Sequence, residues 1–152
     1  MDQNELARKH LERKLSPLRS IALVPPARGW LRAIREALGL TGAQLAARLG
    51  VVPSRIPALE KAEANGGTTL KTMREAAEAM GCTFVYAIVP TKPLDEMLRA
   101  RAVALADAEL ARVHHTMRLE DQALDARDLA DARERLVASY LSGNPRRLWD
   151  KL

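Results

Sequence analysis

The stretch LTGAQLAARLGVVPSRIPALEK, residues 40–61, decides the fold expected of this chain. Thr41 is followed three residues later by Gln44, the spacing of a capping box, in which each side chain binds the other residue's backbone N–H at a helix start. Gly50 follows an apolar helical stripe, and glycine commonly ends a helix because it adopts the left-handed conformation at low cost. Pro53 suits the first turn of a second helix, where its missing N–H would have no partner. The stretch therefore predicts two short helices joined by a tight corner.

The second of these helices has two different faces. Its buried side carries Ile56 and Leu59, and its opposite side carries Ser54, Arg55 and Ala58. Two helices that meet at a corner, the second with a polar, arginine-bearing face, are typical of a helix-turn-helix DNA reader.

The surface expected to contact DNA draws on both helices. The start of the first helix would meet a backbone phosphate through N–H groups and the helix dipole. On the second helix, Arg55 is the expected guanine reader, since a bidentate contact discriminates between bases by about 1–3 kcal/mol. The residues assigned to DNA binding are Thr41, Gly42, Gln44, Val52, Ser54, Arg55, Ala58 and Lys61. An interior proline costs about 3 kcal/mol or more unless it lies within about the first turn. We expect this helix to begin near Val52 or Pro53, so that Pro57 distorts it only mildly.

These residues carry a resemblance to a known family. The stretch is similar to the lambda-repressor/Cro-like (Xre) family of bacterial helix-turn-helix proteins, in both its T-x-x-[QE]-L-A-x-x-L-G-V opening and its I-x-x-L-E-[KR] ending. The matching residues are Thr41, Gln44, Leu45, Ala46, Leu49, Gly50, Val51, Ile56, Leu59, Glu60 and Lys61. The resemblance implies a structural ion pair between Glu60 and Arg35, which lies in the helix expected over residues 29–38. An ordinary pair of packed helices would not explain this conjunction of residues.

Composition and charge agree with a helical protein that binds DNA. Of the 152 residues, 47% are hydrophobic but only 3% are aromatic, which favours helices packed on helices. The net charge is +5, and residues 1–80 contain 13 Lys+Arg against 8 Asp+Glu, whereas residues 81–152 contain 11 of each. The positive excess therefore lies in the half with the two-helix stretch, as attraction to phosphate requires.

Other features disfavour several classes of protein. The single cysteine, Cys82, cannot form an internal disulfide, which indicates the reducing cytoplasm. The sequence contains no run of 18 apolar residues that would span a membrane, and MDQNELARKH is too polar for a signal peptide. The adjacent His114 and His115 cannot share one helical face, so we expect no metal and no cofactor. No nucleophile–base constellation or glycine-rich phosphate loop indicates an enzyme.

The rest of the chain is expected to be mainly helical. We predict an N-terminal helix and Pro-rich linker over residues 1–28, the helix-turn-helix domain over 29–81, one short β-strand over 82–90, and a C-terminal helical hairpin over 91–152 that binds a partner. The strand prediction rests on CTFVYAIV, which is rich in β-branched and aromatic residues and stops at a proline.

This strand has no visible partner in the sequence. Phe84, Tyr86 and Ile88 would share one face. Because a lone strand leaves its backbone groups unpaired, the economical solution is pairing with the same strand of a second copy, which gives a homodimer on a palindromic DNA operator. The alternative is a strand on the domain's own edge.

Five longer segments, taken in their order along the chain, resemble the mobile mystery protein A family. These are helix-turn-helix proteins encoded beside a Fic-domain partner. The segments, between about residues 22 and 150, are PPARGWLRAIREALG, TTLKTMREAAEAMGC, FVYAIVP, TMRLEDQAL and GNPRRLWD. The resemblance implies an antitoxin that represses its own operon and neutralises a Fic-domain toxin, an AMP-transferase. The alternative is a plain Xre-type repressor whose C-terminal helices serve dimerisation or ligand sensing.

The segment TMRLED resembles the [ST]-x-x-x-E-[GN] inhibitory motif of antitoxins that silence Fic toxins. Thr116 and Glu120 match, while Asp121 stands where the motif has Gly or Asn. In that family the glutamate pairs with a toxin arginine that would otherwise hold the γ-phosphate of ATP, a role a carboxylate can fill through bidentate hydrogen bonds.

Overall fold

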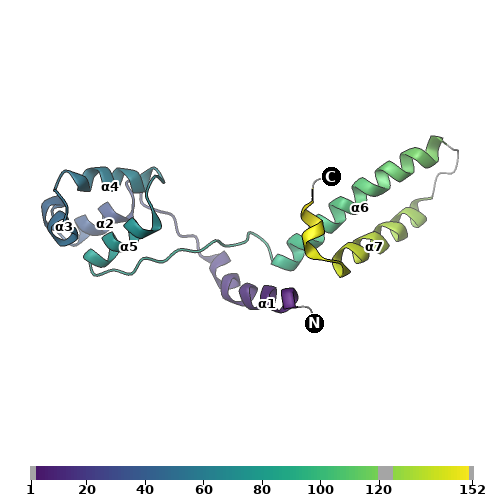
Figure 1. Ribbon diagram of the computed structural model, residues 1–152, viewed down its shortest axis with the longest axis horizontal. Coiled ribbons are helices and arrows are strands. Elements are labelled where there is room, and N and C mark those ends of the chain that lie inside the picture. Colours follow the sequence, from purple (N-terminus) through teal and green to yellow (C-terminus); the bar gives the residue numbers. More distant parts are fainter. Residues whose placement is uncertain (1–2, 120–124, 151–152) are drawn as a thin grey trace. The chain divides into compact units, whose positions relative to one another are not determined.

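The computed structural model describes residues 3–119 and 125–150, and these are mainly helical (Figure 1). The chain divides into two compact units. The central unit is Ala22–Ile88, and the terminal unit combines Met1–Ile21 with Val89–Leu152. Residues 22–28 therefore belong with the helix-turn-helix domain, whereas the N-terminal helix belongs with the C-terminal helices, a grouping that differs from the division at residue 28 made from the sequence.

The central unit contains four helices, α2 (Trp30–Ala37), α3 (Gly42–Leu49), α4 (Arg55–Ala64) and α5 (Leu70–Ala79). Their inward faces meet in one apolar core, whose buried members are Leu31, Leu45, Ala46, Ile56, Met73, Ala76 and Met80. Leu45 of α3 and Ile56 of α4 are 0% and 1% exposed. Because each buried side chain of this size contributes about 1.5–3 kcal/mol, the packing of these two residues fixes α4 on α3.

The ends of these helices follow local signals in the sequence. Thr41 and Gln44 form the predicted capping box at the start of α3, and Gly50 ends that helix with a left-handed φ of 68°. Thr69 starts α5 by accepting a hydrogen bond from the Thr72 N–H at 3.1 Å. The capping box and the helix end at Gly50 are confirmed as predicted. Each capping side chain satisfies a backbone group that a helix end leaves unpaired.

Helix α4 begins and ends later than expected. It starts at Arg55 rather than at Val52 or Pro53, after a turn in which the Arg55 N–H donates to the Val52 C=O at 2.9 Å. Pro57 is therefore the third residue of the helix, where a missing N–H removes no intrahelical hydrogen bond. The proline is compatible with a regular helix that continues to Ala64.

The strand predicted over residues 82–90 is wrong for the single chain. These residues are irregular, and no β-strand occurs in residues 3–119 and 125–150. A strand needs a neighbour for its N–H and C=O groups, and the all-helical central unit offers none. The apolar side chains of this segment have different surroundings: Phe84 packs against the core, whereas Val85 and Ile88 are 79% and 89% exposed. β-Propensity reflects the fit to a pleated, half-buried surface, so these residue types alone do not make a strand.

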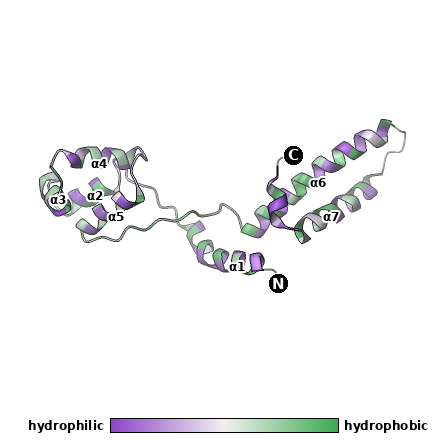
Figure 2. Ribbon diagram, in the orientation of Figure 1, coloured by the Kyte–Doolittle hydropathy of each residue, from purple (hydrophilic) through white to green (hydrophobic). Residues whose placement is uncertain are grey.

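The terminal unit is built on a helical hairpin. Its elements are α1 (Gln3–Leu15), a 3₁₀ turn η1 (Ser16–Ser20), α6 (Leu94–Leu119), α7 (Ala126–Ser142) and a 3₁₀ turn η2 (Pro145–Trp149). Helices α6 and α7 pack together around Ala102, Leu105, Ala106, Val137 and Leu148. Figure 2 shows hydrophilic and hydrophobic residues mixed along both helices, as expected where each helix covers its neighbour with one face only. Among the described helices, none combines the length and hydropathy needed to cross a bilayer.

Polar contacts hold α1 within the terminal unit. No residue of α1 is buried. Arg19 binds the Glu12 carboxylate, with Nη2 to Oε2 at 2.8 Å, and also donates to the Pro90 C=O at 2.9 Å. Glu12 also accepts a hydrogen bond from the Leu94 N–H, at 3.2 Å, at the start of α6. The pKa of Glu12 is lowered, chiefly by the hydrogen bond from Arg19, so the carboxylate stays charged and continues to join these segments.

Candidate nucleic-acid interface

The corner between α3 and α4 brings the starts of the two helices together. The Val51 N–H donates to the Ala46 C=O at 3.0 Å, which closes the last turn of α3 beside the left-handed Gly50. A Cβ at Gly42 would lie 3.8 Å from the Cβ of Ile56. The first residue of α3 therefore touches the first turn of α4, and the two sets of expected DNA contacts lie on neighbouring elements.

A buried ion pair holds α4 against α2. Arg35 donates through Nε and Nη2 to the two carboxylate oxygens of Glu60, the Nη2–Oε2 distance being 3.2 Å, and Nη1 donates to the Leu40 C=O at 2.9 Å. Glu60 is only 6% exposed. The hydrogen bond to Glu60 is the main cause of a raised pKa for Arg35. A charge buried this far must keep its partner, so the pair fixes the position of α4.

A second carboxylate of α4 caps α2, and the sequence analysis missed it. Glu63 accepts from the Trp30 N–H at 2.7 Å and from the Leu31 N–H at 2.9 Å. A carboxylate at this end also suits the positive end of the helix dipole. Gly29, at φ 88°, permits the contact, since an added Cβ would meet Glu63 Oε2 at 2.7 Å. Only the fold brings residues 29 and 63 together, so no local pattern could have revealed this cap.

At the start of α3, the capping box uses two of the groups assigned to DNA. Thr41 Oγ1 accepts from the Gln44 N–H at 3.1 Å, and Gln44 Oε1 accepts from the Thr41 N–H at 2.8 Å. The N–H groups that helix geometry leaves open for a phosphate are those of Gly42 and Ala43. Gln44 therefore acts by holding the helix end, and its own N–H is already used.

The expected base-reading side chains share one exposed face of α4. Arg55, Ala58 and Lys61 follow one another at three-residue steps, and all are exposed. Neither Arg55 nor Lys61 forms an ion pair with any described residue. Ser54 makes no capping hydrogen bond, and Val52 is 65% exposed in the preceding corner. The face thus presents a free guanidinium and a free ammonium beside small residues, which allows close approach to base edges.

Both structural units carry a share of the positive excess. The central unit contains eight Lys+Arg and five Asp+Glu, whereas the rest of the chain contains sixteen and fourteen. The excess of positive charge is therefore three in the central unit and two outside it. The excess counted over residues 1–80 therefore combines the charge of the helix-turn-helix domain with that of the N-terminal helix, which belongs to the terminal unit.

The residues assigned to the other functions lie in different places. Phe84 is half-buried against the central core, while Tyr86 stacks on it with ring centroids 6.0 Å apart and is 64% exposed, and Ile88 is 89% exposed. Thr116 is exposed on α6, where Oγ1 donates to the Arg112 C=O at 3.1 Å. Glu120 and Asp121 lie outside the described residues.

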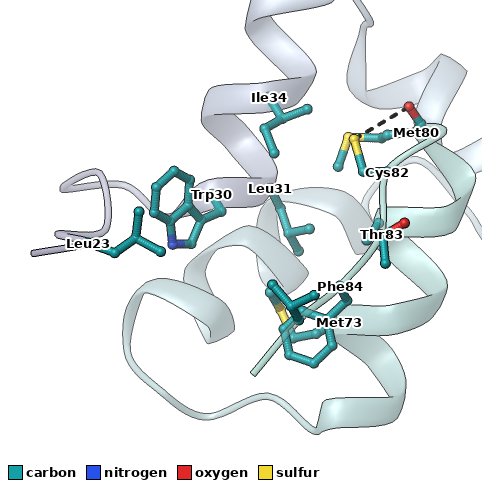
Figure 3. A pocket seen from close by; sticks show the side chains of 11 residues that line it. Leu23, Trp30, Leu31, Ile34, Met73, Met80, Cys82, Thr83 and Phe84 are labelled. Atoms are coloured by element: carbon teal, nitrogen blue, oxygen red, sulfur yellow. Dashed lines mark hydrogen bonds between the residues drawn. The ribbon is translucent and has the colours of Figure 1, made fainter. Parts of the chain in front are cut away.

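An apolar hollow of about 300 Å³ opens in the central unit, between α2, α5 and residues 82–85 (Figure 3). Figure 3 shows Trp30, Met73 and Phe84 among the side chains that line it. The single cysteine of the chain, Cys82, also lines the hollow, where its thiol donates to the Met80 C=O at 3.7 Å. Neither this hollow nor any other described part of the chain gathers three His, Cys, Asp or Glu side chains that could hold a metal ion.

Comparison with known proteins supports the assignment of the central unit. A family model described as helix-turn-helix matches residues 31–86. Comparison with curated proteins and with solved structures finds no match for the chain. The matched residues contain α3, α4 and α5 and all of α2 except its first residue, so the prediction of a helix-turn-helix domain is confirmed. The match supports a DNA-binding regulator of the Xre type, a class that is typically not enzymatic.

Proposed function

We propose that this chain is an antitoxin, a dimeric DNA-binding repressor of its own operon that also neutralises a Fic-domain toxin. The observation that carries the DNA-binding part is the contrast between the two sides of α4. One side is held by Glu60 and Glu63, and the other presents Arg55 without an ion pair to any described residue. A free guanidinium on a firmly held helix is suited to a bidentate contact with guanine in the major groove.

Substitution of Arg55 tests base reading. The binding of Arg55→Ala is compared on a duplex taken from upstream of the gene and on a mixed-sequence duplex of equal length, at one salt concentration. The variant should lose about 1–3 kcal/mol of discrimination between the two duplexes. Arg127→Ala, which removes an exposed arginine of α7, is the control and should change neither affinity. Equal losses on both duplexes for Arg55→Ala would contradict the base-reading role.

The dimer is proposed from the exposed side chains of residues 82–90. Tyr86, Ile88 and Val85 are more than 60% exposed, and the backbone beside them has no strand partner among the described residues. Pairing with the same segment of a second copy would cover both. Ile88→Glu should shift the sedimentation coefficient to that of a monomer and weaken binding to a two-half-site duplex. Leu38→Glu, at an exposed apolar position in the same unit, should leave a dimer; a dimer in both variants would contradict the role of this segment.

The antitoxin part of the proposal rests on the resemblance of TMRLEDQAL and GNPRRLWD to the family encoded beside Fic toxins. Thr116 presents an exposed side chain in the last turn of α6, and Glu120 follows it four residues later in the sequence. The test is AMP transfer by the product of the neighbouring gene, with and without this protein. Glu120→Ala should restore the activity that the wild-type protein suppresses, whereas Asp131→Ala, at an exposed acidic position of α7, should still suppress it.

The second candidate is a plain Xre-type repressor whose terminal unit serves dimerisation or ligand sensing. The feature that favours it is the exposure of apolar side chains on the terminal unit, including Leu119 at 77% and Trp149 at 60%, since exposed apolar surface can mark an association site. A neighbouring gene with an H-P-F-x-x-G-N-G-R motif favours the antitoxin. If the product of the neighbouring gene transfers AMP equally with and without this protein, the antitoxin role is excluded and the plain repressor is the function that is left.

A further inference from the structure

A cationic hollow of about 430 Å³ lies beside α4 in the central unit. Its wall carries Arg28, Arg32, Arg35, Lys61 and Glu60, together with Pro57. The family resemblance assigns a role to Arg35, Glu60 and Lys61 only. Arg28 and Arg32 are positively charged residues for which neither the base-reading face nor the helix-turn-helix core has a use.

The ion pairs around this hollow leave two of its four cations free. Arg35 is neutralised by Glu60, and Arg32 is paired with Glu36 at 2.8 Å on the surface. Arg28 and Lys61 form no ion pair with any described residue. An anion entering the hollow would thus meet two uncompensated positive charges, with the partly exposed Arg32 beside them.

The backbone holds Arg28 in place next to α4. Residues 26–29 form a turn in which the Gly29 N–H donates to the Pro26 C=O at 2.9 Å. Directly after this turn, the first two N–H groups of α2 are bound by Glu63. Because Glu63 belongs to α4, the same helix that would read bases also fixes the turn that carries Arg28. The backbone of Arg28 is therefore held beside α4, and its exposed side chain is left without an ion pair to any described residue.

The hollow borders the exposed face of α4 on one side. Pro57, Lys61 and Ala64 follow one another at steps of four and three residues and so line the edge of the helix. Lys61 also follows Ala58 at a step of three, on the base-reading face. In the major groove, a helix is flanked by rows of phosphates that fix its register through contacts with basic side chains. An anion site along one edge of α4 lies where such a row would run.

We propose that Arg28 and Lys61, with Arg32 beside them, bind a phosphate of the DNA backbone at the edge of the groove that α4 enters. This inference rests on the proposed function, in which α4 reads DNA. Arginine suits the task because its planar guanidinium can donate two parallel hydrogen bonds to a phosphate. Since phosphate contacts carry no sequence information, the site adds affinity and register and leaves base preference to Arg55.

The salt dependence of DNA binding tests the site. The affinity of the full chain for a mixed-sequence duplex is measured between 50 and 200 mM salt for wild type, Arg28→Gln and Lys92→Gln. Each phosphate contact contributes about 0.9 to the slope of log affinity against log salt. Arg28→Gln should make the slope less steep by about that amount. It should also weaken binding about equally on the mixed-sequence duplex and the upstream duplex. Lys92→Gln, an equal loss of charge in the terminal unit, should keep the wild-type slope.

Other results would overturn the inference in distinguishable ways. If Arg28→Gln keeps the wild-type slope while Arg55→Ala still loses discrimination, the phosphate site is wrong and the DNA-reading function stands. If the wild-type protein itself binds neither duplex, the proposed function fails first. Inorganic phosphate that binds wild type but not Arg28→Gln, with no change in DNA slope, would show a site for a free anion instead. A thermal unfolding midpoint equal to wild type shows that Arg28→Gln is folded.

Discussion

The ion pair that orients α4 in the central unit and the ion pair that joins α6 to α7 in the terminal unit lie in different surroundings. In the central unit, the side chains of Arg35 and Glu60 are 13% and 7% exposed. In the hairpin of the terminal unit, the side chains of Arg133 and Asp107 are 43% and 52% exposed. Water can replace a lost partner at an exposed pair but not at a buried one. Removing one partner of the pair that orients α4 should therefore destabilise the central unit strongly. Removing one partner of the exposed pair in the hairpin should have little effect.

The two cores differ in the size of the side chains that fill them. The central core is made largely of Leu, Ile and Met side chains from four helices. Of the five buried residues in the terminal core, two are alanines, Ala102 and Ala106. Apolar side chains also remain open on the terminal unit, including Leu119 at 77% and Trp149 at 60% exposure. The central unit also exposes apolar side chains, including Ile88 at 89%, so the two units differ in the size of the side chains that fill their cores and not in how completely they are closed.

The largest expected effect comes from Glu60→Ala, which leaves the Arg35 guanidinium buried without its partner. We expect the central unit to lose about 3–5 kcal/mol of unfolding free energy. Each unit has one tryptophan, so Trp30 fluorescence in a Trp149→Phe background reports on the central unit alone. Asp107→Ala, which breaks the exposed pair with Arg133, is the matched control. A similar small change for both variants would remove the distinction between the two units.

The next effect in size concerns the terminal core. Leu148, in η2, is 1% exposed, and Leu148→Ala should cost the terminal unit about 2–5 kcal/mol through lost burial and a cavity. Helical circular dichroism should show an earlier transition. The transition followed by Trp30 should keep its midpoint, since the central unit has its own core. A shift of both transitions would mean that the units unfold together and that the comparison does not hold.

A smaller effect is expected at the start of α3. Thr41→Ala removes the side-chain half of the capping box and should cost about 1 kcal/mol, measured by urea unfolding of the central unit. Thr41→Ser retains the hydroxyl and should restore most of the loss. If serine and alanine destabilise equally, the hydroxyl is not what starts the helix.

The smallest effect concerns Tyr140 of α7, whose hydroxyl donates to Glu109 of α6. This hydrogen bond is the main cause of a raised pKa for Tyr140, and burial adds to it. The neutral hydroxyl is favoured in the folded state, so the contribution to stability is full below about pH 10 and is lost as the pH rises through the raised pKa. Absorbance titration in a Tyr86→Phe background should show Glu109→Gln lowering the pKa of Tyr140. An unchanged titration would exclude Glu109 as the cause.

The sequence by itself determined the local features of the helix-turn-helix. The capping box of Thr41 and Gln44 and the left-handed Gly50 are formed by residues within a few positions of each other, so their chemistry is visible in the sequence. The partnership of Arg35 and Glu60 came from the family resemblance, and the two residues are indeed paired.

Only the tertiary structure decided the features that join distant segments. The grouping of the N-terminal helix with α6 depends on Glu12 and Arg19 meeting residues 90 and 94. The cap of α2 by Glu63 and the position of Arg28 depend on α4 lying across the turn at Gly29. Residues 82–90 failed as a strand because a strand depends on its neighbour, which residue types alone cannot supply. Local hydrogen bonds can be inferred from spacing, whereas contacts between distant residues depend on how the helices pack.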